Sequence, residues 1–207
     1  MEMEKGQSMA GRRGRMAERG SSLVELAVAT IIILTISAMA ILQMWPAQQQ
    51  SQATAGLDAV KSTLRLARET AISQRRTIVV EFVGTNTIKL FQMVVVAGTP
   101  PVVTMASAPF LTIPIENTVQ FMTFSGEVDT PDKFGLPTVP SGISFPGAVG
   151  NPQFQSDGTL TDSNGTPING TVFLSVPGTT SATGAVTVMG NTGRIRAYHY
   201  TGGGWWQ

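Results

Sequence analysis

The residues best suited to bind a ligand lie in one short segment near the end of the chain. Residues 194–200 read RIRAYHY, in which basic and aromatic side chains alternate with others. Because residues i, i+2 and i+4 of a strand share a face, Ile195, Ala197 and His199 would line one face. If Ile195 and Ala197 pack inward, two guanidiniums and two phenols face outward. Guanidiniums suit phosphates and aromatic rings suit stacked bases, so the candidate DNA-binding residues are Arg194, Arg196, Tyr198 and Tyr200.

This row of side chains also has a structural interpretation. Arginine and tyrosine commonly form solvated cross-strand pairs on an exposed face. Residues 46–207 carry nine basic and nine acidic side chains, so few other phosphate contacts are available. Trp205 and Trp206 follow a triple glycine, and we expect them on a flexible tail that could add base stacking. A structural role or a contact with another subunit is the favoured interpretation, and DNA binding is the alternative.

The remaining polar residues do not indicate catalysis or a metal site. The chain has no cysteine, so thiolate chemistry is excluded. His199 is the only histidine, so a serine triad would have to use it, and it lies near no nucleophile motif. Asp157, Asp162 and Asn164 lie among Gly and Thr, as calcium ligands can, but their spacing is not that of an EF-hand loop and such residues more often make turns. We predict no enzyme activity, no metal and no cofactor.

The N-terminal region contains one apolar segment of membrane-spanning length. Residues 23–45 read LVELAVATIIILTISAMAILQMW, with Glu25 as the only charge, and about 20 apolar residues span a bilayer as a helix. Residues 1–20 carry five basic and three acidic side chains. The positive-inside rule therefore keeps residues 1–20 in the cytoplasm and places the C-terminal region across the membrane.

The apolar segment also has other interpretations. A secretory signal peptide could be cut after the small residues Ala38 and Ala40, but Glu25 and the length of the apolar run oppose it. A plain signal anchor would give Glu25 no role. A twin-arginine signal lacks the usual residues around Arg12 and Arg13.

The residues ahead of the apolar run carry a more specific signal. Gly20 precedes Ser21-Ser22-Leu23-Val24-Glu25, and this order resembles a type IV prepilin signal. The resemblance implies a basic leader, residues 1–20, that prepilin peptidase removes between Gly20 and Ser21, with N-methylation of the new amine of Ser21. The first mature residue is usually Phe, so Ser21 departs from the pattern. Glu25 would be the fifth mature residue, paired during filament assembly with the N-terminal amine of a neighbouring subunit.

The chain after the apolar run predicts an amphipathic helix. We expect Pro46 to kink or interrupt the helix. Beyond it, apolar residues recur at spacings of three and four, which marks one buried stripe on a continuation of the helix over residues 46–76. The stripe consists of Leu57, Val60, Leu64, Ala67 and Ala71.

Residues 77–207 predict a β-rich head. The patterns favour strands at 77–83, 87–96, 119–124, 171–176, 185–189 and 194–200, with a turn at 84–86 and a tight connection at 190–193. Residues 97–116 are Pro-broken and read as irregular or edge-like, and residues 125–152 as a long loop. Together, 97–152 form a variable insertion. The predicted fold is α+β: a long N-terminal helix packed on antiparallel sheet, as in type IV pilin-like proteins.

The head carries a second resemblance. The junction LRLARETAISQRRTIVVEF, the turn at 154–158 (FQSDG) and the closing hairpin with GRIR at 193–196 are similar to the GspH/FimT family. This resemblance implies a minor pseudopilin of a type II secretion pseudopilus or type IV pilus-like filament. Its partners would be other pilin subunits, prepilin peptidase, the bacterial inner membrane and secreted cargo, with the head in the periplasm. The alternative is a FimT-like minor pilin that binds DNA for uptake.

Overall fold

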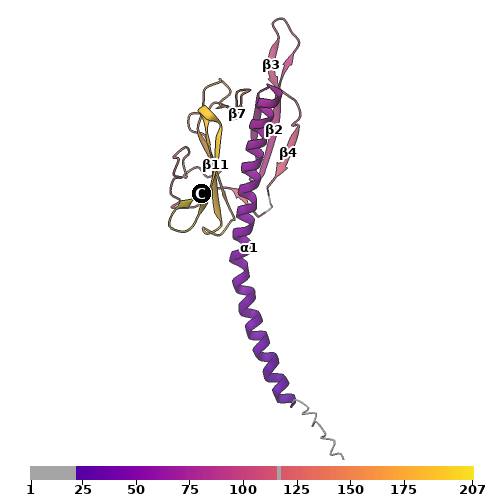
Figure 1. The fold of residues 1–207 in the computed structure, drawn as a ribbon, viewed down its shortest axis with the longest axis vertical. Coiled ribbons are helices and arrows are strands. Elements are labelled where there is room, and N and C mark those ends of the chain that lie inside the picture. Colours follow the sequence, from indigo (N-terminus) through magenta and orange to yellow (C-terminus); the bar gives the residue numbers. More distant parts are fainter. Residues whose placement is uncertain (1–21, 116–117) are drawn as a thin grey trace, which may run out of the picture. The chain divides into compact units, whose positions relative to one another are not determined.

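The computed structural model describes residues 22–115 and 118–207. It divides into two compact units, Met1–Gln43 and Met44–Gln207, which are considered separately. The helix α1, Leu23–Gln74, belongs to both units, and all strands belong to the second (Figure 1). The leader and the predicted Gly20–Ser21 cleavage site lie outside the described residues.

In the N-terminal unit, α1 is apolar on every side. The large apolar side chains from Leu23 to Ile41 are exposed. A globular helix normally shows one apolar stripe, whereas a helix that is apolar all round is buried in other protein or in lipid. The segment is long and apolar enough to cross a bilayer.

Pro46 does not interrupt the helix. The α-helix continues on both sides of this residue, from Leu23 to Gln74, so the predicted interruption is wrong. Proline removes one backbone donor, but the remaining hydrogen bonds of the adjacent turns keep the backbone helical.

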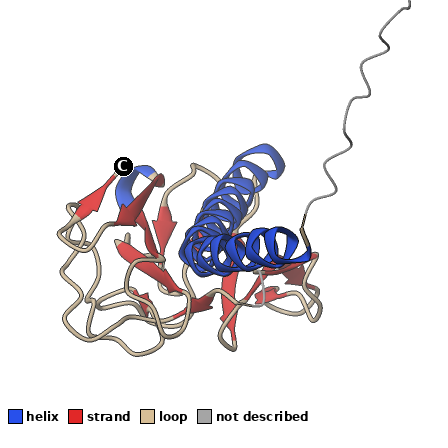
Figure 2. Cartoon of the chain, turned by 90° about the horizontal axis from the view of Figure 1, so that it is seen from below, coloured by secondary structure: helices blue, strands red, loops and turns tan. Residues whose placement is uncertain are grey.

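In the C-terminal unit, α1 buries the predicted stripe. Leu57, Val60, Leu64, Ala67 and Ala71 are all buried in one hydrophobic cluster with residues of both sheets. Figure 2 shows the strands gathered beside the helix. The spacing in the sequence therefore located the packed face of the helix correctly.

The first sheet has the strand order β3-β2-β1-β7-β8, with β4 also paired to β2. The pairings are antiparallel, and the predicted strands at 77–83 and 87–96 are confirmed, as is the turn between them, where Gly84 has a φ of 62°. The predicted 154–158 turn joins β7 and β8. The strands are β1 Ile78–Val83, β2 Thr87–Val96, β3 Val102–Met105, β4 Leu111–Pro114, β7 Gln153–Phe154 and β8 Leu160–Thr161.

Residues 97–115 bear out the edge-like alternative of the prediction. They supply β3 and β4, which pair with successive parts of the same edge of β2. Because β1 pairs with β2 only as far as Gln92, the end of β2 and β3 form a two-stranded ribbon beyond the sheet. Val95, Val96, Val102 and Val103 on this ribbon are exposed.

The second sheet has the order β12-β11-β10-β9-β5, with β6 paired to β9. A 3₁₀ turn at Gly190–Thr192 joins β10 and β11, which confirms the predicted tight connection. The predicted 194–200 strand is confirmed residue for residue as β11. The strands are β5 Gln120–Phe121, β6 Ile143–Ser144, β9 Gly170–Ser175, β10 Thr183–Met189, β11 Arg194–Tyr200 and β12 Trp205–Trp206.

The core lies between α1 and the two sheets. Phe154 and Leu160 from the first sheet and Val172 and Val186 from the second join the helix stripe in the same buried cluster. The predicted α+β fold, a long N-terminal helix packed on antiparallel sheet, is confirmed.

Candidate functional site

Glu25 lies in the first turn of α1 and is exposed. The backbone there is helical, since Leu26 N–H donates to Ser22 O at 3.1 Å. The N-terminal end of a helix carries unpaired N–H groups and a partial positive charge, so a carboxylate is favoured at this end. Glu25 is therefore an exposed carboxyl side chain at the start of the helix, and it is the one charged residue within 23–45.

The tyrosines of the Arg/Tyr row of β11 do not face solvent as predicted. Tyr198 is only 3% exposed and Tyr200 only 8%. Ile195 and Ala197 are buried on the opposite face, in the cluster that includes the helix stripe. The tyrosine side chains are covered as well, so the expectation that two phenols face outward is wrong.

The cover over this row is the β5–β6 loop, residues 122–142, and its key residue is Asp132. The Asp132 Oδ2 atom accepts hydrogen bonds from Thr187 Oγ1 at 2.6 Å and from the Tyr198 hydroxyl at 3.0 Å. The Oδ1 atom accepts from Arg196 Nη1 at 3.2 Å and lies 3.7 Å from Arg194 Nη2. One carboxylate thus contacts two neighbouring strands and both candidate arginines.

The arginines keep partial exposure. The exposed fractions of the Arg194 and Arg196 side chains are 45% and 34%. A hydrogen bond with the Tyr198 hydroxyl, together with the charge of Asp132, raises the pKa of the Arg196 guanidinium. Because the two guanidiniums are only partly exposed and already share one carboxylate, they have less charge and fewer donors available for a phosphate than two free guanidiniums would have.

The tryptophan tail is part of the second sheet. Trp205 and Trp206 form β12, paired with Tyr200 and His199 of β11. The Trp205 indole Nε1 donates to Val128 O at 2.8 Å, and its ring lies 5.1 Å from the ring of Tyr200. The predicted flexible tail is therefore wrong: aromatic packing and the strand pairing fix these residues.

Gly193, the glycine of the GRIR segment, has a packing role. Its φ is 59°, in the left-handed region that favours glycine. A Cβ atom at this position would overlap Gly158 O and crowd the Arg68 side chain. Glycine is therefore required here by the close approach of the turn at 155–158 to the turn at 190–193.

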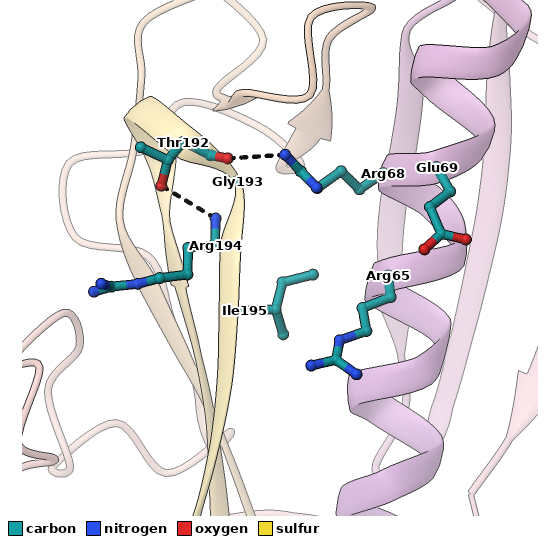
Figure 3. Close-up of a pocket in the computed structure, with 7 residues that line it drawn as sticks. All are labelled: Arg65, Arg68, Glu69, Thr192, Gly193, Arg194 and Ile195. Atoms are coloured by element: carbon teal, nitrogen blue, oxygen red, sulfur yellow. Dashed lines mark hydrogen bonds between the residues drawn. The ribbon is translucent and has the colours of Figure 1, made fainter.

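Arg68 of α1 joins these two turns. Its Nε donates to Gly158 O at 3.1 Å. Its Nη2 donates to Thr192 O at 3.2 Å, as Figure 3 shows. These groups border a cavity of ≈310 Å³, whose lining residues are Arg65, Arg68, Glu69, Thr192, Gly193, Arg194 and Ile195. In Figure 3 the Arg194 side chain extends away from Arg65, so the guanidiniums do not converge on one point.

The candidate calcium residues make turns. Asp157 Oδ1 accepts from the N–H and the hydroxyl of Thr159, and these hydrogen bonds lower the pKa of Asp157. Asp162 Oδ1 accepts from the N–H groups of Asn164 and Thr166 at 2.9 Å each. Within residues 22–115 and 118–207, no group of three or more His, Cys, Asp or Glu side chains is arranged to hold a metal ion.

One notable carboxyl group was missed by sequence reasoning. Glu127, in the β5–β6 loop, is only 8% exposed. Its Oε2 accepts from Phe124 N–H at 3.0 Å, whereas its Oε1 is buried without a hydrogen-bond partner among the described residues. Burial raises the pKa of Glu127 to about 7. A single acidic residue in a loop gives no pattern from which this burial could be read.

Comparisons with known proteins show similarity of fold. No protein-family model matches the chain, and no curated protein sequence matches it. The chain is similar to the crystal structure of the type IV minor pilin FimU of Pseudomonas aeruginosa, with 16% identity over 76% of this chain and 94% of that chain and a TM-score of 0.47. It is also similar to the minor pseudopilin EpsH from the type 2 secretion system of Vibrio cholerae, with 15% identity over 72% of this chain and 97% of that chain and a TM-score of 0.43.

Proposed function

We propose that this chain is a minor subunit of a pilin-like filament, anchored in the bacterial inner membrane by the N-terminal part of α1 with its head in the periplasm. The observation that carries the proposal is the character of α1. Its first half exposes apolar side chains on every side, with Glu25 in the first turn, whereas its second half buries one stripe under a β-rich head. The first half therefore suits apolar surroundings, in lipid before assembly and among other helices afterwards.

Glu25 would set the position of the subunit in the filament. A carboxylate in a bilayer costs about 2.5–3.5 kcal/mol at the centre of the membrane and less near the interface, so a paired Glu25 is favoured over a free one. The prepilin resemblance implies that the partner of Glu25 is the amine of Ser21 on a neighbouring subunit. Cleavage after Gly20 would generate this amine. The proposal includes this cleavage and N-methylation of Ser21, as well as the other filament subunits and the peptidase as partners.

A structural role in a secretion pseudopilus is favoured over DNA uptake. Tyr198 and Tyr200 are buried, and Asp132 contacts both arginines of the candidate DNA-binding row. The row therefore supports the fold of the head. Secreted protein cargo and other subunits remain the proposed partners of the exposed surface.

The test is assembly of the full-length protein in cells that make its filament. We expect Glu25→Ala to reduce incorporation into the filament strongly, while processing at Gly20 and the level of protein in the membrane stay unchanged. The matched control is Glu69→Ala, an exposed carboxylate on the head segment of α1, which should assemble normally. Normal assembly of the Glu25→Ala protein would refute the role of Glu25 in positioning the subunit. A mature N-terminus at residue 41 would refute the proposal that the chain is a membrane-anchored filament subunit.

A further inference from the structure

A second cavity lies beside β12, away from the Arg/Tyr row. Its volume is ≈340 Å³, and its lining contains no Asp, Glu, Lys or Arg. It is formed by α1, by the 181–183 segment that leads into β10, and by the ends of β11 and β12. The lining residues used below are Gln50, Ala53, His199, Thr201 and Trp206.

Trp206 forms an aromatic platform at this cavity. The indole ring stacks on the ring of His199, with 4.8 Å between centroids and 25° between planes. The backbone of Trp206 is held by pairing with His199 in the β12–β11 ladder. The side chain is nevertheless 53% exposed, so one face of a positioned indole is covered and the rest is open.

Several polar side chains of the cavity are open to solvent. Gln50, Thr201 and Trp206 are exposed, so the Gln50 amide, the Trp206 indole N–H and the Thr201 hydroxyl are available to a ligand. By contrast, the neighbouring hydroxyl of Thr54 donates to Gln50 O at 2.9 Å, and that of Thr183 lies 3.0 Å from Ser175 Oγ. The exposed groups of Gln50, Thr201 and Trp206 comprise hydrogen-bond donors and an amide carbonyl. All of them border the same neutral cavity.

We propose that this cavity binds a neutral saccharide, and that an N-acetylated hexosamine fits it best. The C–H face of a pyranose ring is apolar and packs on an exposed indole, while its hydroxyl groups need uncharged donors and acceptors around the rim. The Gln50 amide is complementary to the amide of an acetamido group, and Ala53 offers an apolar contact for its methyl group. Ligand sites combine aromatic walls with a few placed polar groups in about 300–1,000 Å³, so this cavity has room for about one ring and part of a second.

The absence of charged residues from the lining disfavours anionic ligands. Phosphorylated and carboxylated ligands are normally held by Arg, Lys or helix N-termini, and none of these lines the cavity. The inference does not depend on the filament role. It does suit a periplasmic head, because the glycan strands of a cell wall consist of N-acetylated sugars.

The test uses the full-length chain in a detergent without a sugar headgroup, because a glycoside detergent would compete. Titration calorimetry with chitotriose, a trimer of N-acetylglucosamine, should give saturable binding, and maltotriose, which lacks acetamido groups, should bind more weakly. Trp206→Ala should weaken chitotriose binding by about tenfold or more, whereas Trp206→Phe keeps a stacking ring and should lose less. Gln50→Ala should remove the preference for chitotriose over maltotriose.

The matched control is Gln48→Ala, an exposed glutamine on the same helix that does not line the cavity. It should bind chitotriose as the unchanged protein does, and circular dichroism should show that every variant is folded. Absence of saturable binding at millimolar chitotriose would overturn the proposal, as would binding that is equal in Trp206→Ala. Displacement of the sugar by a capped, uncharged peptide at lower concentration would overturn it in favour of a polypeptide groove.

Discussion

The hydroxyl group of Tyr198 donates a hydrogen bond to Asp132 Oδ2 at 3.0 Å. This contact joins β11 to the β5–β6 loop across 66 residues of sequence. The same carboxylate contacts Thr187 on β10 and Arg196 on β11. The loop is thereby fixed over the second sheet, which is why the phenols of β11 are inside the protein.

Asp132→Ala should destabilise the head. Loss of the Asp132 carboxylate leaves the Thr187 and Tyr198 hydroxyl groups without their acceptor. An unsatisfied buried polar group costs about 1–3 kcal/mol. The measurement is the free energy of unfolding from denaturant titration of the purified chain. Asp58→Ala, which removes an exposed carboxylate on α1, should change stability little; an equal loss in both variants would contradict the role of Asp132.

The double variant Arg194→Gln/Arg196→Gln should leave any DNA affinity of the chain unchanged, because both guanidiniums already contact Asp132. The measurement is DNA binding by the full-length chain at two salt concentrations. Phosphate contacts make affinity fall steeply with salt. Salt-sensitive binding that disappears in the double variant would instead establish the DNA-uptake alternative.

Glu127 should make the stability of the head depend on pH. Burial raises its pKa from an ordinary value of 4.5 to about 7 in the folded state. The folded state therefore binds the proton more tightly than the unfolded state, so the contribution of Glu127 to stability is full below about pH 4.5. It falls as the pH rises to about 7 and is constant above that.

Glu127→Gln should remove this slope and stabilise the protein above pH 7 by on the order of 1–3 kcal/mol, because an amide needs no proton to stay neutral. Unfolding free energies at a series of pH values, compared with the exposed control Glu69→Gln, provide the measurement. The control should keep the slope between pH 4.5 and 7, and a slope that persists equally in Glu127→Gln would refute the assignment.

Gly193→Ala should destabilise the head by about 2–4 kcal/mol. The new methyl group would overlap Gly158 O, and alanine is also disfavoured at a φ of 59°. Gly84→Ala is a matched control, because Gly84 has a φ of 62° with nothing near its Cβ position. The control should lose about 1 kcal/mol, and equal losses in thermal or denaturant unfolding would contradict the close approach at Gly193.

The sequence predicted the elements that depend on local periodicity. The helix stripe around Leu57 and Val60, the strands on both sides of Gly84 and the full extent of β11 all follow from spacings of three, four or two residues. The burial of the β11 face that carries Tyr198 could not be predicted from such spacings. Alternation shows that Tyr198 shares a face with Arg196, but whether that face is covered depends on Asp132, which is distant in sequence.

The strands β3, β4 and β12 were not assigned as strands from the sequence, for related reasons. The strands β3 and β4 are short and lie next to prolines, and the pairing that stabilises them comes from β2. The strand β12 follows three glycines, a pattern typical of a flexible tail, and it is held by contacts of Trp205 with Val128 and Tyr200. The burial of Glu127 likewise depends on how the β5–β6 loop folds over the sheet.

Arg68 has a mechanical consequence for a subunit under tension. Its guanidinium bonds to Gly158 in the first sheet's β7–β8 turn and to Thr192 in the second sheet's β10–β11 turn. A traction force that enters the head through α1 would therefore reach both sheets through this residue, in addition to the buried helix stripe. Under load the sheets should yield together rather than in sequence, and forced unfolding of the head should show a single rupture event.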